Sequence, residues 1–240
     1  MSQCETMKKR ILKENSQSWP TEDDIEKFLL KHPHSLGWDE NVTNNKSAFY
    51  PYKGMADLSE IEQMIITSIA IFTGGHVPSV RDVSKFNKAL ADNPDDLLPL
   101  RGGFRNPDLV DYKIAHHVMS LLSNRRCKPF EAYRGISVDK NPAFFAGLKP
   151  GIEFNNWPIS SFATSESIAK RFARNVSYGY RNKEPLVIIV PNMNRGTSIS
   201  PYSLFSDEDE FVSSVRLKIL DYQLFQYHMR DWHYLTCEAF

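Results

Sequence analysis

The sequence has little cysteine: Cys4, Cys127 and Cys237 are the three among 240 residues, and none belongs to a C-x-x-C pair. This scarcity argues against a disulfide framework or a zinc site, and it fits a reducing compartment. Net charge is lacking too, because 29 Lys and Arg residues balance 29 Asp and Glu residues. Such a chain is not drawn to nucleic acid by its overall field, although a local basic groove is still allowed.

Long apolar runs are also missing. The longest, around Met64 to Phe72, is interrupted by Thr67 and Ser68 and is too short to span a bilayer. No apolar run follows the charged residues near the N-terminus, so we expect no signal peptide and a cytoplasmic protein, or one exported by a route without such a signal. What is present, 41% hydrophobic and 24% charged residues, is typical of a globular protein with an adequate core.

Familiar catalytic motifs are absent from the sequence. It has no Walker-type loop, no G-x-G-x-x-G and no G-x-S-x-G. The seven histidines form no set at metal-ligand spacing, so we expect structural or surface roles for them and no metal.

The predicted helices come first and the predicted strands follow. Helical periodicity and capping signals predict helices over 21–31, 57–72, 80–90, 106–126 and 165–176. Runs of β-branched and aromatic residues predict strands over 130–136, 159–164, 185–191, 208–220 and 231–238. This order indicates an α+β domain, with residues 1–55 as a polar, partly helical extension and 56–240 as the main domain.

Two stretches combine strand signals with reactive side chains. Y-R-G at 133–135 places an arginine in an apolar strand: it is either an edge-strand residue or a guanidinium fork for phosphate or carboxylate. Gly135 would let a flat ligand approach the backbone. S-S-F-A-T-S at 160–165 runs into a capped helix, and its hydroxyls either cap that helix or also hold a neighbouring carboxylate.

The third stretch is S-D-E-D-E-F-V at 206–212. If a strand begins there, Glu208 and Glu210 point to one face, and Asp207 and Asp209 point to the other. Like charges on one face persist best where a cationic group lies between them. A solvated acidic turn before a strand is the alternative.

In this order the three stretches resemble the R-S-E class of mono-ADP-ribosyltransferases, and most closely the small T-even-type phage enzymes that modify host proteins. Y-R-G matches the arginine motif, S-F-A-T-S followed by A-K-R-F-A the serine motif, and E-D-E-F-V the E-x-E motif. The similarity spans roughly residues 57–238. It implies N-terminal helices followed by two packed, mainly antiparallel sheets around an NAD cleft, with residues 56–240 as the catalytic domain.

The resemblance also implies roles for single residues, with NAD as substrate and no metal. Arg134 would contact the NAD phosphates or the adjoining ribose, and the Gly135 backbone would meet the nicotinamide carboxamide. Glu210 would hold the ribose 2′-OH and stabilise the positive charge that develops as nicotinamide leaves. Glu208 would orient and deprotonate the acceptor, which the E-x-E form indicates is an arginine of a target protein.

Some assignments stay open within the resemblance. Where many members read S-T-S, this chain reads A-T-S at 163–165, so the hydroxyl that braces Glu210 is that of Ser161, Thr164 or Ser165. In the substrate-recognition loop, Tyr202 and Phe205 either contact the target or pack in the core. The side chains after the serine motif that either contact phosphate or form a solvated helix face are Arg171, Arg174 and Arg181.

Other functions compete with arginine modification. The same site would suit an NAD glycohydrolase, or a transferase acting on RNA or another side chain. Glycoside hydrolysis by the glutamate pair would leave Arg134 and the hydroxyls without a role. A non-catalytic NAD- or protein-binding module is favoured by the A-T-S departure. Separation of Arg134, residues 161–165 and the two glutamates onto different faces would exclude the transferase.

Overall fold

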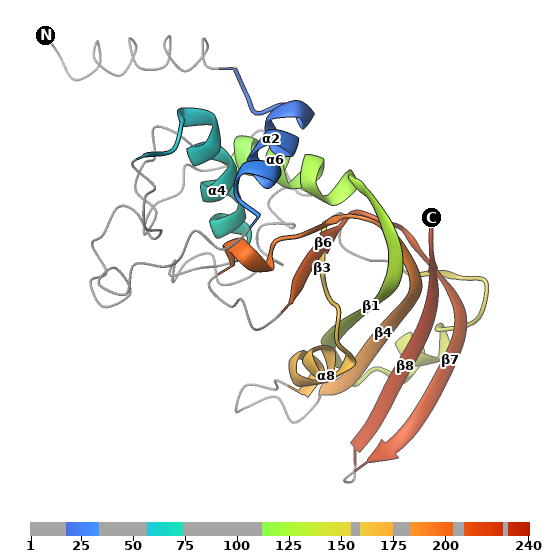
Figure 1. Cartoon of the computed structure of the whole chain (residues 1–240). Coiled ribbons are helices and arrows are strands. Elements are labelled where there is room, and N and C mark those ends of the chain that lie inside the picture. Colours follow the sequence, from blue (N-terminus) through green and yellow to red (C-terminus); the bar gives the residue numbers. More distant parts are fainter. Residues whose placement is uncertain are drawn as a thin grey trace, which may run out of the picture. The chain divides into compact units, whose positions relative to one another are not determined.

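A computed structural model describes residues 18–33, 57–73, 112–154, 159–174, 183–203, 209–227 and 230–240. Figure 1 shows their course. The chain divides into two compact units, residues 1–118 and 119–240. Helices precede strands, which confirms the predicted α+β class. The predicted helix 80–90 lies outside the described residues, and the predicted domain boundary after residue 55 stays a prediction.

The first unit is helical where it is described. Its helices are α2 (Glu22–Lys31), α4 (Glu60–Phe72) and the beginning of α6 (Tyr112–Asn124). Thr21 caps α2 and forms a capping box with Asp24. The buried side chains of α2 are Ile25 and Phe28, which lie on one face of the helix. In α4 the six consecutive residues 64–69 are all buried, and so is Phe72, so this helix is enclosed on all sides over that stretch.

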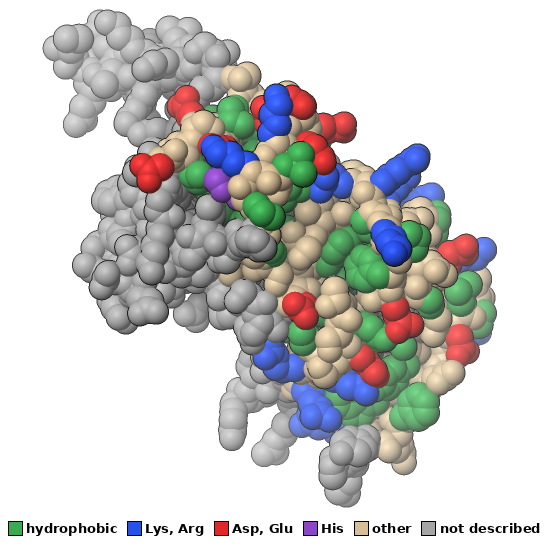
Figure 2. Space-filling model, viewed as in Figure 1, with side chains coloured by type: hydrophobic (Ala, Val, Ile, Leu, Met, Phe, Trp, Pro, Cys, Tyr) green, Lys and Arg blue, Asp and Glu red, His purple; other side chains and the backbone are tan. Residues whose placement is uncertain are grey.

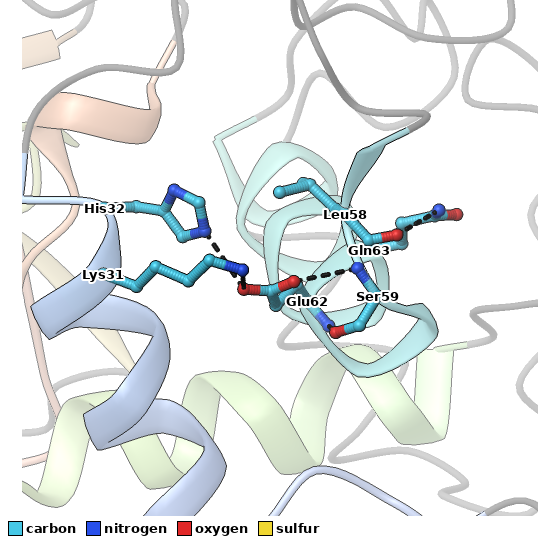
Figure 3. A network of polar contacts seen from close by, with 6 residues as sticks. All are labelled: Lys31, His32, Leu58, Ser59, Glu62 and Gln63. Carbon is cyan, nitrogen blue, oxygen red and sulfur yellow. Dashed lines mark hydrogen bonds and ion pairs between the residues drawn. The ribbon is translucent and has the colours of Figure 1, made fainter.

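One carboxylate joins α2 to α4 (Figure 3). Glu62 accepts a hydrogen bond of 2.8 Å from the Ser59 backbone N–H, and its own N–H donates to the Ser59 hydroxyl at 3.3 Å. This pair is a capping box for α4. The Glu62 Oε1 atom also lies 2.8 Å from Lys31 Nζ and 3.1 Å from His32 Nε2, at the end of α2. Burial alone would raise the pKa of Glu62, but these bonds outweigh burial and lower the pKa to about 2.

The second unit is built on eight strands. They are β1 (Arg126–Asp139), β2 (Glu153–Phe154), β3 (Ser160–Ala163), β4 (Lys183–Arg195), β5 (Thr197–Ser198), β6 (Glu210–Ser213), β7 (Leu217–Tyr227) and β8 (Arg230–Ala239). Their order is β2-β7-β8-β4-β1-β3-β6-β5, and every neighbouring pair is antiparallel except β4 and β8. The mainly antiparallel prediction is confirmed. The strands form one continuous curved ladder in place of two separate sheets, because β1 pairs with both β4 and β3 (Figure 1).

The boundaries of several elements differ from the predictions. The predicted strand 208–220 is divided into β6 and β7. Between them Ser214 leaves the ladder and bonds the end of α6, with its hydroxyl 2.7 Å from Asn124 Oδ1. The short elements β2, β5, α7 (Pro142–Ala146) and the 3-10 helix η2 (Ser200–Tyr202) were not predicted.

Two cores lie on the two faces of the ladder. On one face, helix α8 (Glu166–Arg174) packs through Ala169 and Ala173 against Val187 and Trp232. On the other face lies a larger cluster whose members include Ala132, Phe162, Leu186, Ile188, Phe211, Leu235 and Cys237. Strand β4 alternates between the two clusters, which is why its sequence is apolar throughout.

Gly135 sets how closely α8 approaches β1. A Cβ atom at this position would lie 1.7 Å from the Ala169 carbonyl oxygen and 2.8 Å from the Ala173 nitrogen. Any larger residue would therefore push the helix off the strand. The glycine of Y-R-G has a packing role whether or not it also meets a ligand.

A buried polar network extends the larger cluster. Nδ1 of His233 lies 2.7 Å from the Tyr222 hydroxyl, and Nε2 lies 2.9 Å from a Glu184 carboxylate oxygen. The other Glu184 oxygen pairs with Lys140 Nζ at 3.1 Å, and the ring of Phe145 stacks on the imidazole. His233 thus has the structural role that the sequence predicted for histidines.

Three further observations concern the described part of the chain. None of its helices is long and apolar enough to cross a membrane. No group of three or more His, Cys, Asp and Glu side chains in it is arranged to hold a metal ion. Cys127 and Cys237 are free thiols, and burial raises the pKa of Cys237 to about 12.

Candidate functional site

Three neighbouring strands bring the three sequence stretches together. Strand β3 lies between β1 and β6. Tyr133 on β1 is in register with Ala163 on β3, and Ala163 is in register with Glu210 on β6. The antiparallel pairing therefore places the residues next to Tyr133, the hydroxyl-rich strand and the end of the acidic run side by side.

Ser161 connects the other two candidates. A terminal nitrogen of Arg134 donates a 2.8 Å hydrogen bond to the Ser161 carbonyl oxygen. The Ser161 hydroxyl donates a 2.6 Å hydrogen bond to Glu210 Oε1. One residue thus holds the guanidinium through its backbone and the carboxylate through its side chain. A bond this short to a carboxylate is a charge-assisted one and fixes the orientation of Glu210.

Arg134 is partly buried, and its Nε atom lies inside the protein. Burial lowers the pKa of Arg134 to about 10, against the opposing effect of the Glu210 carboxylate, so the guanidinium stays charged near neutral pH. The guanidinium carbon Cζ of Arg134 lies 5.9 Å from the centre of the buried Phe162 ring. Within the described residues, the buried Nε atom of Arg134 has no hydrogen-bond acceptor. A buried donor of this kind is unfavourable unless a ligand supplies the acceptor.

The structure distinguishes the three hydroxyls that the sequence left open. The hydroxyl that bonds Glu210 is that of Ser161. Thr164 Oγ1 lies 3.3 Å from Asp209 Oδ2, and Ser165 Oγ lies 2.7 Å from Ser167 Oγ. The missing hydroxyl of the A-T-S stretch is therefore no obstacle to bracing Glu210.

The acidic run differs from its prediction at one residue. Strand β6 begins at Glu210, and Asp209 has φ 45°, in the left-handed region. The predicted strand start at residue 208 is therefore wrong, because the turn at Asp209 interrupts the extended backbone before Glu210. That Glu208 and Glu210 share one face stays a prediction. The Asp209 side chain is exposed. Glu208 and Phe205 lie outside the described residues.

The structure also shows how far Tyr202 and two arginines of α8 are buried. Tyr202 in η2 is 2% exposed, so of its two open roles the structure supports core packing, and burial raises its pKa to about 12. Arg171 and Arg174 are exposed on α8. Together with Ser167 and Lys170 they line an open hollow of ≈ 390 Å³. Arg181 lies outside the described residues.

Phe162 and Asp209 are neighbours of the site that the motifs did not single out. The alternation of β3 places Phe162 on the face opposite the Ser161 hydroxyl, but only the structure shows that its ring lies near the Arg134 guanidinium. No sequence signal indicates the left-handed turn at Asp209, although aspartate is one of the residues that tolerate it.

No protein-family model and no curated protein matches the sequence. Among solved structures, the chain is similar to the ADP-ribosyltransferase toxin Plx2a from Paenibacillus larvae, at 12% identity and a TM-score of 0.49, over 86% of this chain and 99% of that one. The ADP-ribosyltransferase HopU1 of Pseudomonas syringae is similar at 15% identity and a TM-score of 0.48, over 94% and 100%. The Vis toxin, an ADP-ribosyltransferase from Vibrio splendidus, is similar at 17% identity and a TM-score of 0.42, over 94% and 88%. At these sequence identities and TM-scores, the similarity does not assign the chain to a family.

Proposed function

We propose that the protein transfers ADP-ribose from NAD to an arginine side chain of a target protein and releases nicotinamide. The observation that carries the proposal is the hydrogen-bonded connection of Arg134, Ser161 and Glu210 across β1, β3 and β6. It holds a cation and an oriented carboxylate close together. NAD needs both, a cation for its phosphates and a carboxylate where positive charge develops on the ribose.

The Arg134 guanidinium supports binding of the dinucleotide. One terminal nitrogen is used by Ser161, while the buried Nε has no acceptor within the described residues. A phosphate or ribose oxygen of NAD would supply that acceptor and satisfy the donor. In this role Arg134 binds and orients the NAD molecule.

Glu210 is proposed to act on the ribose that carries nicotinamide. Its carboxylate, fixed by Ser161, would accept a hydrogen bond from the 2′-OH. The bond between C1′ of the ribose and the nicotinamide nitrogen breaks, and its electron pair leaves with nicotinamide. A fixed carboxylate stabilises the positive charge that remains on the ribose, because it needs no reorganisation at that moment.

Glu208 is proposed to serve the acceptor. A guanidinium nitrogen of the target arginine forms the new bond to C1′, and the proton that it loses passes to the Glu208 carboxylate. The resemblance of the E-x-E stretch to phage enzymes supports an arginine acceptor, a host protein as the target and the host cytoplasm as the location.

The test is incubation of the protein with labelled NAD and a cell lysate. We expect labelled proteins with the wild type, and a loss of at least about 100-fold with Glu210→Ala, the scale of one electrostatic stabiliser. Glu208→Ala should lose transfer and keep part of the nicotinamide release. Glu238→Ala removes an exposed carboxylate of β8 and is the matched control, with unchanged activity. Full transfer activity in Glu208→Ala and Glu210→Ala would reject the mechanism.

The products of this assay also distinguish the competing functions. Nicotinamide release without a modified acceptor would indicate a glycohydrolase. Mass spectrometry of the product distinguishes an arginine from RNA or another side chain. NAD binding without any nicotinamide release would indicate a non-catalytic module.

A further inference from the structure

Helix α8 presents a basic face to the surface. Ser167, Lys170, Arg171 and Arg174 follow the i, i+3, i+4, i+7 spacing that places side chains on one side of a helix, and they line the hollow of ≈ 390 Å³. The opposite side of α8 is buried through its alanines. The basic face is therefore the outward side of a helix that is firmly attached to the sheet.

Positive charge is concentrated on this face although the whole chain has a formal net charge of zero. Lys170 is paired with Glu166 at 2.7 Å, which partly compensates its charge. Figure 2 shows Lys and Arg side chains next to hydrophobic ones in the part of the view where Figure 1 draws α8. A local concentration of this kind attracts an anionic partner.

Aromatic rings continue the basic face onto the hairpin of β7 and β8. Lys170 Nζ lies 5.8 Å from the centre of the Tyr234 ring, and the Arg174 guanidinium lies 5.1 Å from the Trp232 ring. The Phe225 ring packs edge-on against Tyr234 at 5.3 Å and is half-exposed. Register pairs Phe225 with Trp232, so both lie on the α8 face of the sheet.

We propose that this surface, formed by α8 and the β7–β8 hairpin, binds a single-stranded nucleic acid. The cations would contact successive phosphates, and the exposed Phe225 ring would stack on a base. Cations beside a ring that a base can reach are the combination that single-strand binding uses. An acidic protein surface would use the cations but not the ring, and a duplex keeps its bases stacked on one another. The proposal does not depend on the transferase activity, because it uses neither Arg134 nor Glu210.

The test measures fluorescence anisotropy of a labelled oligouridine or oligothymidine of about 12 nucleotides at roughly 50 and 200 mM salt. If three cations contact phosphates, the logarithm of affinity should fall with that of salt with a slope of about −2, some 0.7 per contact. Replacing Lys170, Arg171 and Arg174 by Gln should weaken binding at least tenfold and flatten this slope. The matched control replaces the exposed Lys128, Arg195 and Lys218 by Gln and should leave the affinity and the salt slope unchanged.

A second variant tests the stacking ring. Phe225→Ala should weaken binding by about 5- to 100-fold, the effect of losing one stacked base, and leave the salt slope unchanged. Leu224→Ala, which removes a similarly exposed side chain from the other face of β7, is its control and should bind like the wild type. If the triple variant does not fold, Arg171→Gln alone, with its exposed side chain, should reduce the slope by about 0.7.

Three results would overturn the proposal. Equal affinity for a duplex or for polyglutamate would mean that charge alone is recognised. Unchanged binding by the α8 variants would place the nucleic acid elsewhere. Displacement of the oligonucleotide by saturating NAD would assign the surface to the dinucleotide site.

Discussion

Ser161 contributes two different groups to the candidate site. Its carbonyl oxygen accepts from Arg134, and its hydroxyl donates to Glu210. Substitution by alanine keeps the first contact, which belongs to the backbone, and removes the second. Ser161→Ala therefore isolates the contribution of one hydrogen bond to the orientation of the carboxylate.

We expect Ser161→Ala to lower kcat for nicotinamide release by about 10- to 100-fold, since a hydrogen bond to a charged group contributes about 1.5–3 kcal/mol. Thr164→Val and Ser165→Ala should have smaller effects, because those hydroxyls contact Asp209 and Ser167. Steady-state kinetics of the three variants measures this ranking. A larger loss in Thr164→Val would show that the bracing hydroxyl is misassigned.

The sequence was informative about residue types at the site and less so about their geometry. Arg134, Glu210 and the group of hydroxyls follow from motif order. The choice of Ser161 required the register of β3 and β6, which depends on tertiary pairing. The left-handed Asp209 could not be predicted, because four consecutive acids are compatible with a strand as well as with a turn.

At the scale of elements, the contact between β1 and α8 depends on Gly135. Gly135→Ala would place a Cβ against the α8 backbone, and backbone atoms cannot move aside as a side chain does. We expect the free energy of unfolding to fall by about 2 kcal/mol or more, within the range for overpacked sites. In Gly147→Ala the nearest atom would be 3.2 Å from the new Cβ, so chemical denaturation of this control should show a clearly smaller loss. Equal stability of both variants would contradict the packing role.

The contact of Glu62 with the end of α2 should be sensitive to acid. The pKa of Glu62 is about 2 in the folded protein against an ordinary value of 4.5. A lowered carboxyl pKa gives stability that is complete above about pH 4.5 and is lost as pH falls towards about 2, with a total of about 3 kcal/mol. Glu62→Gln should lower the free energy of unfolding by up to this amount near neutral pH, and the two proteins should converge near pH 2.

Denaturant unfolding at several pH values, followed by helical circular dichroism, measures this convergence. Asp23→Asn is the control, because Asp23 and Lys27 form an ion pair whose side chains are both 71% exposed. Such a pair contributes less than about 1 kcal/mol. A parallel loss for Glu62→Gln at all pH values would reject titration as the cause.

Long elements were predictable, and short or divided ones were not. Helices α2 and α4 carry enough turns for a period and a cap to be recognised, and β4 carries enough apolar residues. The break between β6 and β7 coincides with a contact to α6, where Ser214 meets Asn124, 90 positions away in sequence. Strands of two residues, such as β2 and β5, are too short to show any period.

At the scale of the whole molecule, the division into two compact units predicts independent local stability. Hydrogen exchange measured by mass spectrometry should speed up in α2 and α4 with Glu62→Gln, and in β1 and β4 with Gly135→Ala. Each variant should leave the other unit unchanged. If either substitution accelerates exchange throughout the chain, the two units unfold as one.

The fold class was predictable at this scale, while the order of the strands was not. Helical periods followed by strand periods indicate an α+β protein without any tertiary information. The parallel pair of β4 and β8 joins segments separated by β5, β6 and β7, and no local signal indicates that pairing. It is also what makes the eight strands a single ladder.

The position of β8 in this ladder has a consequence for synthesis. β8 is the last described strand in chain order, yet it lies between β7 and β4 near the centre of the sheet. A nascent chain that has not reached residue 239 has β4 with one edge exposed and cannot complete its sheet. Strand β4, which supports the Arg134 strand β1 from one side, therefore gains its own second neighbour only after β8 has been synthesised, so the site strands can pair before the sheet behind them is complete.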